Sequence, residues 1–340
     1  MEAIYTKKTF FFKNPSGTSR GVLTEKLAYI LEIHKNDKVG IGECSIIEGL
    51  SPDFLSVKDY EKKLNDVCNR IDYYSEHLEE LKNYPSILFG IETALLNLNF
   101  NEPMLYFDNL FSKGKQKIAI NGLVWMGEKD FMLRQVQQKI NEGYKCIKIK
   151  VGAIDFDREC EILEEIRLVY DESKIEIRLD ANGAFEMSNV FDKLNVLSKF
   201  HIHSIEQPIK QGSPLSMKNV VLNSPIPIAL DEELIGVNSI LEKKALLEGI
   251  KPDYIILKPS LHGGLIGTTE WISVAESLKI KWWITSALES NIGLSAIAQF
   301  VSEFNIQLPQ GLGTGSLYTN NIPSHLEVKN GFIYSDNSKK

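Results

Sequence analysis

The sequence lacks most features that mark secreted, membrane-spanning and nucleic-acid-binding proteins. It has four cysteines in 340 residues, with no Cys-x-x-Cys pair and no Cys/His cluster, so neither a disulfide framework nor a zinc site is expected. No apolar run approaches about 18 residues, and no basic flank precedes an apolar stretch at the N-terminus, which argues against a membrane span and a secretory signal. The net charge of −7 and the scattered lysine pairs argue against a nucleic-acid surface. We therefore expect a cytoplasmic chain with reduced thiols and no membrane or nucleic-acid partner.

What is present is ordinary globular composition, with 43% hydrophobic and 24% charged residues. A chain of this length can bury a large core and can hold one barrel-sized domain together with a smaller one. The sequence shows no low-complexity region. It does not decide the oligomeric state, and a homo-oligomer stays open.

The first 112 residues predict an α+β unit, because strand patterns come before helical ones. The strands and helices expected there lie at residues 4–13, 27–34, 39–44, 57–71, 75–82 and 87–99. Residues 14–21, Asn-Pro-Ser-Gly-Thr-Ser-Arg-Gly, have the composition of a mobile loop between the first two strands.

After about residue 113 the pattern changes to regular strand–helix alternation. The apolar strand candidates are 117–124, 146–151, 175–180, 202–206, 226–230, 253–258 and 282–286, with a shorter one near 306–308. Seven or eight such units, each about 25–30 residues long, predict a β/α barrel. The alternative is a doubly wound open sheet, which would be expected to carry a nucleotide loop after its first strand, and none is visible.

The stretch from Tyr144 to Val151 contains the lysine pair Lys148 and Lys150. On a strand these two side chains face the same side. Two like charges a few Å apart repel by roughly 4 kcal/mol at an effective dielectric constant near 20, which favours loss of one proton and predicts a lysine that acts as a base. The alternative interpretation is a strand with two solvated lysines.

Four later strand candidates end in an ionisable residue: Asp180, Glu206, Asp231 and Lys258. A single charged residue at a strand end is usually the polar start of a loop. Here the spacing is one strand–helix unit each time, and the C-terminal ends of barrel strands gather at one mouth. Three carboxylates without a Cys/His cluster predict an Mg²⁺ site completed by water and substrate oxygens.

These residue types suit removal of a proton from a carbon next to a carboxylate. The product is an enediolate dianion, and a divalent ion offsets its charge by several kcal/mol. A lysine with a lowered pKa supplies the base. Lys150 and Lys258, on strands separated around the ring, could face a substrate from opposite sides.

The set resembles the enolase superfamily, specifically its muconate-lactonising branch. The motifs are Lys148-Ile149-Lys150, Asp180-Ala181-Asn182-Gly183, Glu206-Gln207-Pro208, Asp231-Glu232 and Lys258-Pro259. The resemblance covers essentially the whole chain. It implies an α/β fold with an N-terminal α+β capping domain (1–112), a modified (β/α)8 barrel of the β7α type (113–315) and a C-terminal tail (316–340) that returns to the cap.

Three further stretches look like the o-succinylbenzoate synthase family, the dehydratases of the menaquinone pathway, in the form found in Bacteroidetes-type bacteria. They are residues 285–293, 15–21 and 311–316. The resemblance implies that Ser286 to Glu289, including Leu288, hold the succinyl end of the substrate, and that Arg20 lies on the closing loop of the cap.

The same family resemblance implies roles for the mouth residues. Lys150 removes the α-proton and then protonates the departing hydroxyl, a syn elimination, while Lys148 keeps the pKa of Lys150 low. Lys258 stabilises the enediolate from the opposite face of the ring. The implied cofactor is Mg²⁺, with Mn²⁺ as the alternative ion, held by Asp180, Glu206 and Asp231 and supported by Asn182 and Glu232.

Alternatives stay open at this point. The related N-succinylamino acid racemases and epimerases would use Lys150 and Lys258 as two bases. A Schiff-base enzyme built on Lys150 would need no metal, and a binding protein with a degenerate barrel would need no intact site. His201 and His203 are interpreted as structural residues that point into the helix layer, while His262 could approach the mouth or be an ordinary polar loop residue.

Overall fold

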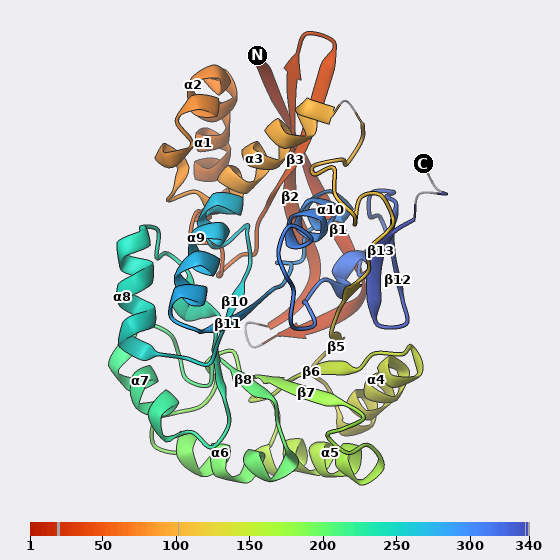
Figure 1. Ribbon diagram of the computed structural model, residues 1–340, viewed down its shortest axis with the longest axis vertical. Coiled ribbons are helices and arrows are strands. Elements are labelled where there is room, and N and C mark those ends of the chain that lie inside the picture. Colours follow the sequence, from red (N-terminus) through yellow and green to blue (C-terminus); the bar gives the residue numbers. More distant parts are fainter. Residues whose placement is uncertain (19–20, 101, 337, 339–340) are drawn as a thin grey trace.

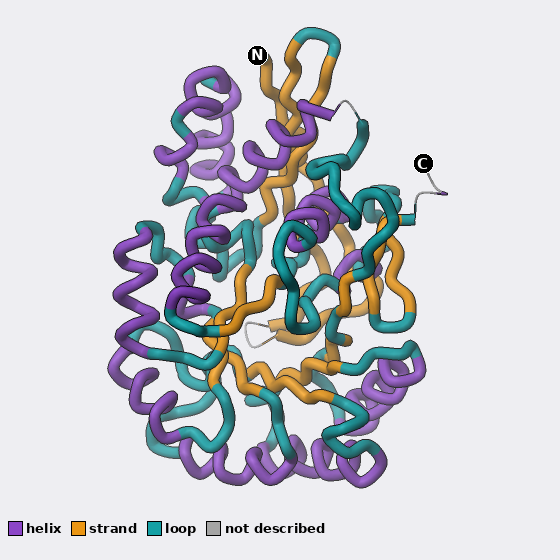
Figure 2. The backbone as a smooth tube through the Cα atoms, in the orientation of Figure 1, coloured by secondary structure: helices purple, strands orange, loops and turns teal. Residues whose placement is uncertain are grey.

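The computed structural model describes residues 1–18, 21–100, 102–336 and 338, and it contains two α/β units (Figure 1). An antiparallel sheet with helices on one side forms the N-terminal cap. A curled parallel sheet inside a layer of helices forms the second unit, as the strands and helices of Figure 2 show. No described helix is long and apolar enough to cross a membrane.

The cap sheet has the order β1-β2-β3, and its helices follow it in the chain. The elements are β1 (Glu2–Thr18), β2 (Gly21–Lys35), β3 (Lys38–Ser45), α1 (Val57–Asn69), α2 (Ile71–Glu76), the 3-10 turn η1 (Leu78–Leu81) and α3 (Pro85–Phe100). The helix α3 is buried along most of its length and packs on β3. Gly42 makes this packing close, because a Cβ there would lie 1.9 Å from the carbonyl oxygen of Gly90.

The prediction of a mobile loop over residues 14–21 is wrong for its first part. Strand β1 continues to Thr18, and Ser16 to Thr18 pair with Leu23 to Gly21. The register shifts between Phe11 and Ser16, where Asn14 and Pro15 interrupt the ladder. Proline lacks an N–H donor and is tolerated at such an irregularity, so the sequence signal for a turn marked a break in the pairing.

The second unit contains seven parallel strands in the order β11-β10-β9-β8-β7-β6-β5. They are β5 (Gly122–Val124), β6 (Cys146–Lys150), β7 (Glu176–Asp180), β8 (Ser204–Glu206), β9 (Ile228–Leu230), β10 (Tyr254–Leu257) and β11 (Lys281–Ile284). The helices between and after them are α4 (Lys129–Asn141), α5 (Phe156–Val169), α6 (Val190–Leu197), α7 (Pro214–Asn223), α8 (Ile240–Ile250), α9 (Gly264–Ser277) and α10 (Asn291–Val301), with the 3-10 turns η2 (Ser198–Phe200), η3 (Glu232–Leu234) and η4 (Gly313–Ser316). The predicted alternation is confirmed.

A two-residue segment closes the gap between the first and last strands. Gln310 bridges to Ile120 before β5, and Gly311 bridges to Thr285 after β11, both in parallel orientation. A Cβ on Gly311 would lie 2.1 Å from the Thr285 hydroxyl, so the closure needs glycine there. The strand predicted near 306–308 is therefore misplaced by a few residues.

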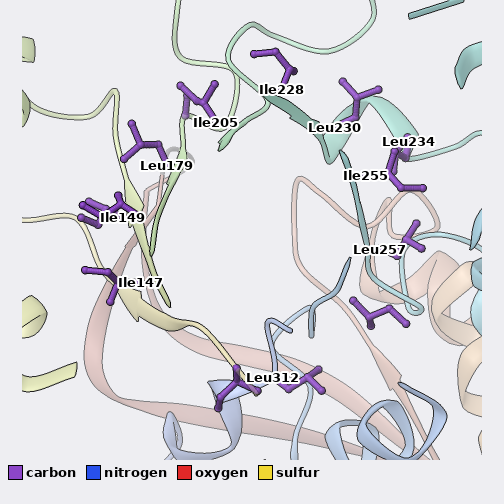
Figure 3. Packing of buried hydrophobic residues seen from close by; sticks show 14 of the residues in the cluster. Ile147, Ile149, Leu179, Ile205, Ile228, Leu230, Leu234, Ile255, Leu257 and Leu312 are labelled. Carbon is purple, nitrogen blue, oxygen red and sulfur yellow. The ribbon is translucent and has the colours of Figure 1, made fainter. Parts of the chain in front are cut away.

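The main core lies between the strands and the surrounding helices. Alternate strand residues such as Ile147, Ile149, Leu179, Ile205 and Ile255 are fully or almost fully buried in it, and Figure 3 shows them spaced around the sheet. Because strand side chains alternate, the residues between them face the interior of the barrel. The interior therefore receives the charged residues that the strand patterns contain.

The N-terminal end of the barrel, which we call the base, is closed by a charged and aromatic cluster. Arg178 is 1% exposed; its Nε donates to Glu176 at 2.8 Å, and its Nη1 donates to the Pro309 carbonyl at 2.9 Å. The guanidinium lies 4.2 Å from the ring centre of Trp283. His203 packs on Tyr254 at this end, with 5.0 Å between ring centroids, and not in the helix layer as its position in the sequence predicted.

Two glutamates of the cap dock it on the second unit. Glu43 on β3 accepts hydrogen bonds from the Ser290 and Gly293 amides, at 2.9 and 3.0 Å, at the N-terminus of α10. Glu92 on α3 accepts from the Leu265 and Ile266 amides, at 2.6 and 3.0 Å, at the N-terminus of α9. A carboxylate at a helix N-terminus satisfies orphan amides and complements the helix dipole.

The C-terminal tail contacts both units. The amide of Thr319 donates to the Phe11 carbonyl, and the amide of Lys13 donates to the Leu317 carbonyl, so residues 317–319 lie along β1. The hairpin β12 (Leu326–Lys329) and β13 (Phe332–Ser335) then pairs with β4 (Ile118–Ala119), at the start of the second unit.

Candidate active site

The charged residues at the strand ends meet inside the mouth of the barrel. In the parallel register Lys150 pairs with Asp180 and Asp180 pairs with Glu206, so these three residues lie abreast on β6, β7 and β8. Asp231 follows β9, and Lys258 follows β10. The three carboxylates are buried, with exposed fractions of 2% or less.

Ion pairs join the lysines to the carboxylates. Lys148 Nζ lies 2.9 Å from Asp180 and 2.6 Å from Glu206, and Lys150 Nζ lies 2.9 Å from the same Asp180 oxygen. Lys258 pairs with Asp231. The three carboxylates, at the ends of β7, β8 and β9, are therefore flanked by the lysines of β6 on one side and Lys258 on the other, which compensates most of the buried charge.

This pairing changes the expected electrostatics of Lys148. Burial alone would lower its pKa, but Asp180, Glu206 and Asp231 hold the pKa of Lys148 above its ordinary value. The pKa of Lys258 is likewise raised against the effect of burial, first by Asp231. Lys148 is thus held in its charged form by carboxylates that the sequence argument left out, because that argument considered the two lysines alone.

The carboxylates respond to the same pairing in different directions. Although burial opposes it, Lys148 and Lys150 hold the pKa of Asp180 well below its usual range. Burial and the neighbouring Asp180 charge raise the pKa of Glu206 well above its usual range. Glu206 is therefore the carboxylate with the least compensated charge.

The donor set fits a divalent cation. Glu206 Oε1 and Asp231 Oδ1 are buried and have no hydrogen-bond partner among the described residues. Buried carboxylate oxygens are costly to leave unpaired, and they are the ligands that Mg²⁺ prefers. Within the described ranges, no three His, Cys, Asp or Glu side chains are already spaced as metal ligands. The ammonium group of Lys148 lies between Asp180 and Glu206, which are two of the candidate metal ligands.

Asn182 and Glu232 lie next to the charged residues, where the family resemblance put them. The amide of Asn182 donates to Asp180 at 3.0 Å, its Oδ1 accepts from Lys150 at 2.6 Å, and its Nδ2 donates to Glu232 at 3.1 Å. The side chain of Asn182 therefore orients the Lys150 ammonium from one side while Asp180 holds it from the other.

The mouth opens into a cavity of about 440 Å³ between the barrel and the cap. Lys148, Lys150 and Lys258 line it from the barrel, and the cap contributes residues of β1, β2 and the loop after β3. These cap residues are Lys13, Asn14, Pro15, Leu23, Ile47, Glu48 and Leu50. A small molecule in this cavity would contact both units.

The four residues predicted to contact substrate fall in different places. Ser286 and Leu288 line the cavity, and the Ser286 hydroxyl lies 2.5 Å from that of Thr314. Leu288 has a φ of 63°, in the left-handed region, and its carbonyl accepts from the Tyr318 hydroxyl at 2.6 Å. Arg20 lies outside the described residues.

The prediction for Glu289 needs correction. Its side chain is 0% exposed and does not line the cavity; Oε1 accepts from the Ser260 hydroxyl at 2.5 Å. The turn at Leu288 places Glu289 behind the cavity wall, where Lys26 of the cap is the nearby cation. The carboxylate of Glu289 is therefore not at the surface of the cavity.

His262, for which the sequence left the mouth and an ordinary loop position open, makes a structural contact in the loop after β10. Its ring is 2% exposed, and Nδ1 accepts from the Lys258 amide at 2.8 Å. Burial lowers the pKa of His262 to about 3, so the ring is neutral.

Sequence reasoning missed two kinds of residue. Gln207 is fully buried and accepts from the amides of Asp231 and Glu233, at 3.3 and 3.2 Å, so it shapes the turn that carries Asp231. Trp125 lines the cavity beyond the end of β5. The signal for Trp125 was the alternation Asn121, Leu123, Trp125 along a strand whose neighbour carries the lysine pair.

Comparisons with known proteins agree with this geometry. A family model described as "Enolase C-terminal domain-like" matches residues 132–337. The o-succinylbenzoate synthase of Desulfotalea psychrophila is 43% identical, over 98% of both chains. The crystal structure of MenC from the same organism superposes with a TM-score of 0.88 at 40% identity, covering 98% of this chain and 99% of that one. An L-Ala-D/L-Glu epimerase from Thermotoga maritima is 24% identical, over 75% of this chain and 69% of its own.

Proposed function

This chain belongs to the o-succinylbenzoate synthase family of the enolase superfamily, and on that premise we propose how its residues make o-succinylbenzoate. The reaction is the syn-dehydration of a succinyl-hydroxy-cyclohexadiene-carboxylate precursor, the work of a hydro-lyase in the menaquinone pathway. The observation that carries the proposal is the position of Lys150. Its ammonium is held by Asp180 and Asn182 at the surface of the cavity.

The proposed steps are two proton transfers at one nitrogen. Lys150 Nζ, in its neutral form, takes the proton from the carbon next to the carboxylate, and the C–H electron pair enters the enediolate. The electrons then return to form the new ring double bond while the C–O bond to the neighbouring hydroxyl breaks. Lys150 gives its proton to the leaving hydroxide, so the products are the aromatic ring and water, and no oxidant is required.

Lys148 and Lys258 contribute charge in this proposal. Lys148 lies two residues before Lys150 on β6, so both side chains are on the same face of the strand, and Lys148 is suited to contact the substrate carboxylate. Lys258 approaches from β10, four strands away in the sheet order, and faces the developing negative charge from another side of the cavity. Such preorganised cations are worth several kcal/mol in a water-poor site.

Enzymes of this superfamily generally use Mg²⁺. We propose that Asp180, Glu206 and Asp231 hold it here, with Mn²⁺ as the alternative ion; when bound, it offsets the negative charge of the substrate carboxylate. The unpartnered oxygens of Glu206 and Asp231 support this assignment. Asn182 and Glu232 orient the groups around it, as outer residues do in metal sites.

The succinyl end of the substrate is assigned to the wall formed by Ser286 to Leu288, with Arg20 as a further proposed contact. The Ser286 and Thr314 hydroxyls support this, since they place two polar groups at the cavity surface. A cytoplasmic location stays a prediction, consistent with the free thiols of the four cysteines, all of which the structure describes.

The first experiment follows the ultraviolet absorbance of the cyclohexadiene precursor mixed with purified protein, with Mg²⁺ and with EDTA. Conversion to the aromatic product is expected with the metal and is expected to disappear in EDTA. Asp180→Asn and Glu206→Gln should each abolish measurable metal-dependent turnover, while Glu161→Gln on the outer face of α5 should not. If both mouth variants keep wild-type metal affinity and turnover, the carboxylate assignment is wrong.

A second candidate, racemisation of N-succinylamino acids, is favoured by one observation. Lys150 and Lys258 line the same cavity, as two bases on opposite faces of a substrate carbon would. The test is deuterium exchange at the α-carbon of N-succinylamino acids. Exchange without conversion of the cyclohexadiene precursor would replace the first function by the second.

A further inference from the structure

An aromatic wall lies beside Lys150 on the β5 side of the cavity. Leu123 pairs with Lys148 and Val124 pairs with Ile149, so Trp125, one residue further on, comes abreast of Lys150. Side chains alternate along a strand, which turns Asn121, Leu123 and Trp125 toward the same interior as the lysine pair. All three line the cavity.

The backbone of Trp125 is fixed by Gln135 of α4, whose side chain also lines the cavity. Its amide donates to Gln135 Oε1 at 3.0 Å, and its carbonyl accepts from Gln135 Nε2 at 3.0 Å. One side chain of α4 therefore satisfies both polar groups of this residue just beyond the last residue of β5. The backbone position from which the indole extends is therefore fixed before any ligand enters.

A second aromatic ring joins the wall from the first turns of α4. Phe131 lines the same cavity and is 41% exposed. Glycine at residue 127 leaves room for the ring in this position, since a Cβ on Gly127 would lie 2.6 Å from the Phe131 ring. Two large apolar rings thus remain partly accessible at the cavity, although burying them would be favourable.

Such a wall selects for the shape of a ligand. Aromatic side chains bind planar rings through stacked or edge-to-face contacts, a contribution that an acyclic chain does not receive to the same degree. The polar groups of the mouth, by contrast, recognise a carboxylate next to an acidic carbon, which ring-shaped and acyclic substrates share.

We propose that Trp125, together with Phe131, is a specificity-determining residue that selects a planar six-membered ring over an acyclic N-acylamino acid, with Gln135 as the residue that positions it. The inference rests on the proposed function, because it takes Lys150 as the group beside which the ring is held.

The test compares Trp125→Leu with wild type in the binding of two ligands that carry the same succinyl group, o-succinylbenzoate and an N-succinylamino acid. We expect the dissociation constant of o-succinylbenzoate to rise about tenfold and that of the acyclic ligand to change less than about twofold. Trp282→Leu on β11 is the matched control, since Trp282 packs on Phe304 and does not line the cavity. Equal losses for both ligands, or no loss for either, would overturn the inference.

Two further variants keep the test decisive if Trp125→Leu folds poorly. Trp125→Phe retains an aromatic face and should retain most of the discrimination between the two ligands. Gln135→Met should lose part of this discrimination, although it leaves the charged residues of the mouth in place. Indole fluorescence gives an independent readout. Trp271 and Trp283 are buried and Trp282 does not line the cavity, so quenching by o-succinylbenzoate is expected to come from Trp125 and to be lost in Trp125→Phe. Quenching that survives in this variant would contradict the placement of the ring.

Wild-type turnover of the cyclohexadiene precursor separates the two proposals. If the wild type turns over the precursor but Trp125→Leu discriminates between the two ligands as well as wild type does, the specificity role is wrong and the proposed dehydratase activity is supported. If the wild type shows no turnover but Trp125→Leu loses the discrimination between the two ligands, the proposed dehydratase activity is wrong and the role of Trp125 in binding a ring is supported.

Discussion

The two ends of the barrel both contain buried charge, yet they differ in what surrounds it. Strand β7 supplies Arg178 to the base and Asp180 to the mouth, two residues apart on the same face. At the base, the guanidinium is hydrogen-bonded to Glu176 and Pro309 and covered by the Trp283 ring. At the mouth, Asp180 borders a cavity of about 440 Å³.

The difference teaches which feature of a buried charge indicates function. Both ends contain ion pairs, so burial and pairing do not separate them. At the mouth, the atoms that lack hydrogen-bond partners within the described chain are carboxylate oxygens of Glu206 and Asp231, beside the cavity that Asp180 lines, whereas at the base the corresponding atom is Arg178 Nη2, in a guanidinium covered by the Trp283 ring. We therefore expect substitutions at the mouth to change activity and substitutions at the base to change stability.

The largest expected effect sharpens this contrast at the mouth. Lys150→Ala should lower turnover by about 10³- to 10⁴-fold, because it removes the group that both takes and returns the proton. Thermal unfolding should not shift downward, since Asp180 keeps its pair with Lys148. Stopped-flow absorbance and calorimetry measure the two quantities, and Lys145→Ala, exposed just before β6, is the control. A destabilised and still active variant would reverse the assignment.

The next effect concerns the base, where we expect a loss of stability with little change in turnover. Arg178→Met should lower the free energy of unfolding by about 3 kcal/mol, because Glu176 loses its partner and the Pro309 carbonyl loses its donor. Turnover per folded molecule should stay within about twofold of wild type at low temperature. Urea unfolding gives the first value, with Arg158→Met on the surface of α5 as the control. A large loss of turnover in a folded protein would connect the base to the chemistry.

Metal addition distinguishes the two ends without a change of sequence. Mg²⁺ at 100 times its dissociation constant should stabilise the wild-type protein by about 2.7 kcal/mol, because it binds the folded state. The same increment is expected in Arg178→Met and should be largely absent in Glu206→Gln. Thermal melts with Mg²⁺ and with EDTA make the comparison. An increment that depends on Arg178 and not on Glu206 would place the ion elsewhere.

The smallest effect concerns pH at the base. Burial lowers the pKa of His203, so the folded protein holds this ring neutral while the unfolded chain takes up a proton below about 6.5. The stability that this group contributes is complete above that pH and is lost as the pH falls through the lowered folded value. His203→Gln should flatten the acid side of the stability curve and leave the pH dependence of turnover unchanged. Matching shifts in both curves would contradict the separation of the two ends.

Much of the architecture could be predicted from the sequence because it depends on local patterns. The seven strands follow from apolar runs at regular spacing, and the mouth residues follow from their place at the ends of those runs. It was possible to predict that Asp180, Glu206 and Asp231 lie close together without knowing any contact, since a barrel gathers the C-terminal ends of all its strands at one side.

What could not be predicted depends on contacts between distant segments. The pKa of Lys148 is set by carboxylates 32 to 83 residues away in the chain. The sequence predicted that Glu289 faces the cavity with its neighbours. It does not, because Leu288 adopts a left-handed backbone conformation that is unusual for leucine and turns Glu289 behind the cavity wall. The closing segment at Gln310 and Gly311 has two residues and no periodicity that a pattern could detect.

The pairing of Phe12 with Tyr318 has a consequence for how the chain is made. At 5–20 residues per second, synthesis of the intervening segment of about 300 residues takes roughly 15 to 60 s. During that time β1 can pair with β2 but lacks its neighbour from the tail, and the barrel lacks the segment that closes it. Two sheet edges therefore stay unpaired until almost the whole chain has been synthesised, and unpaired edges favour association with other chains.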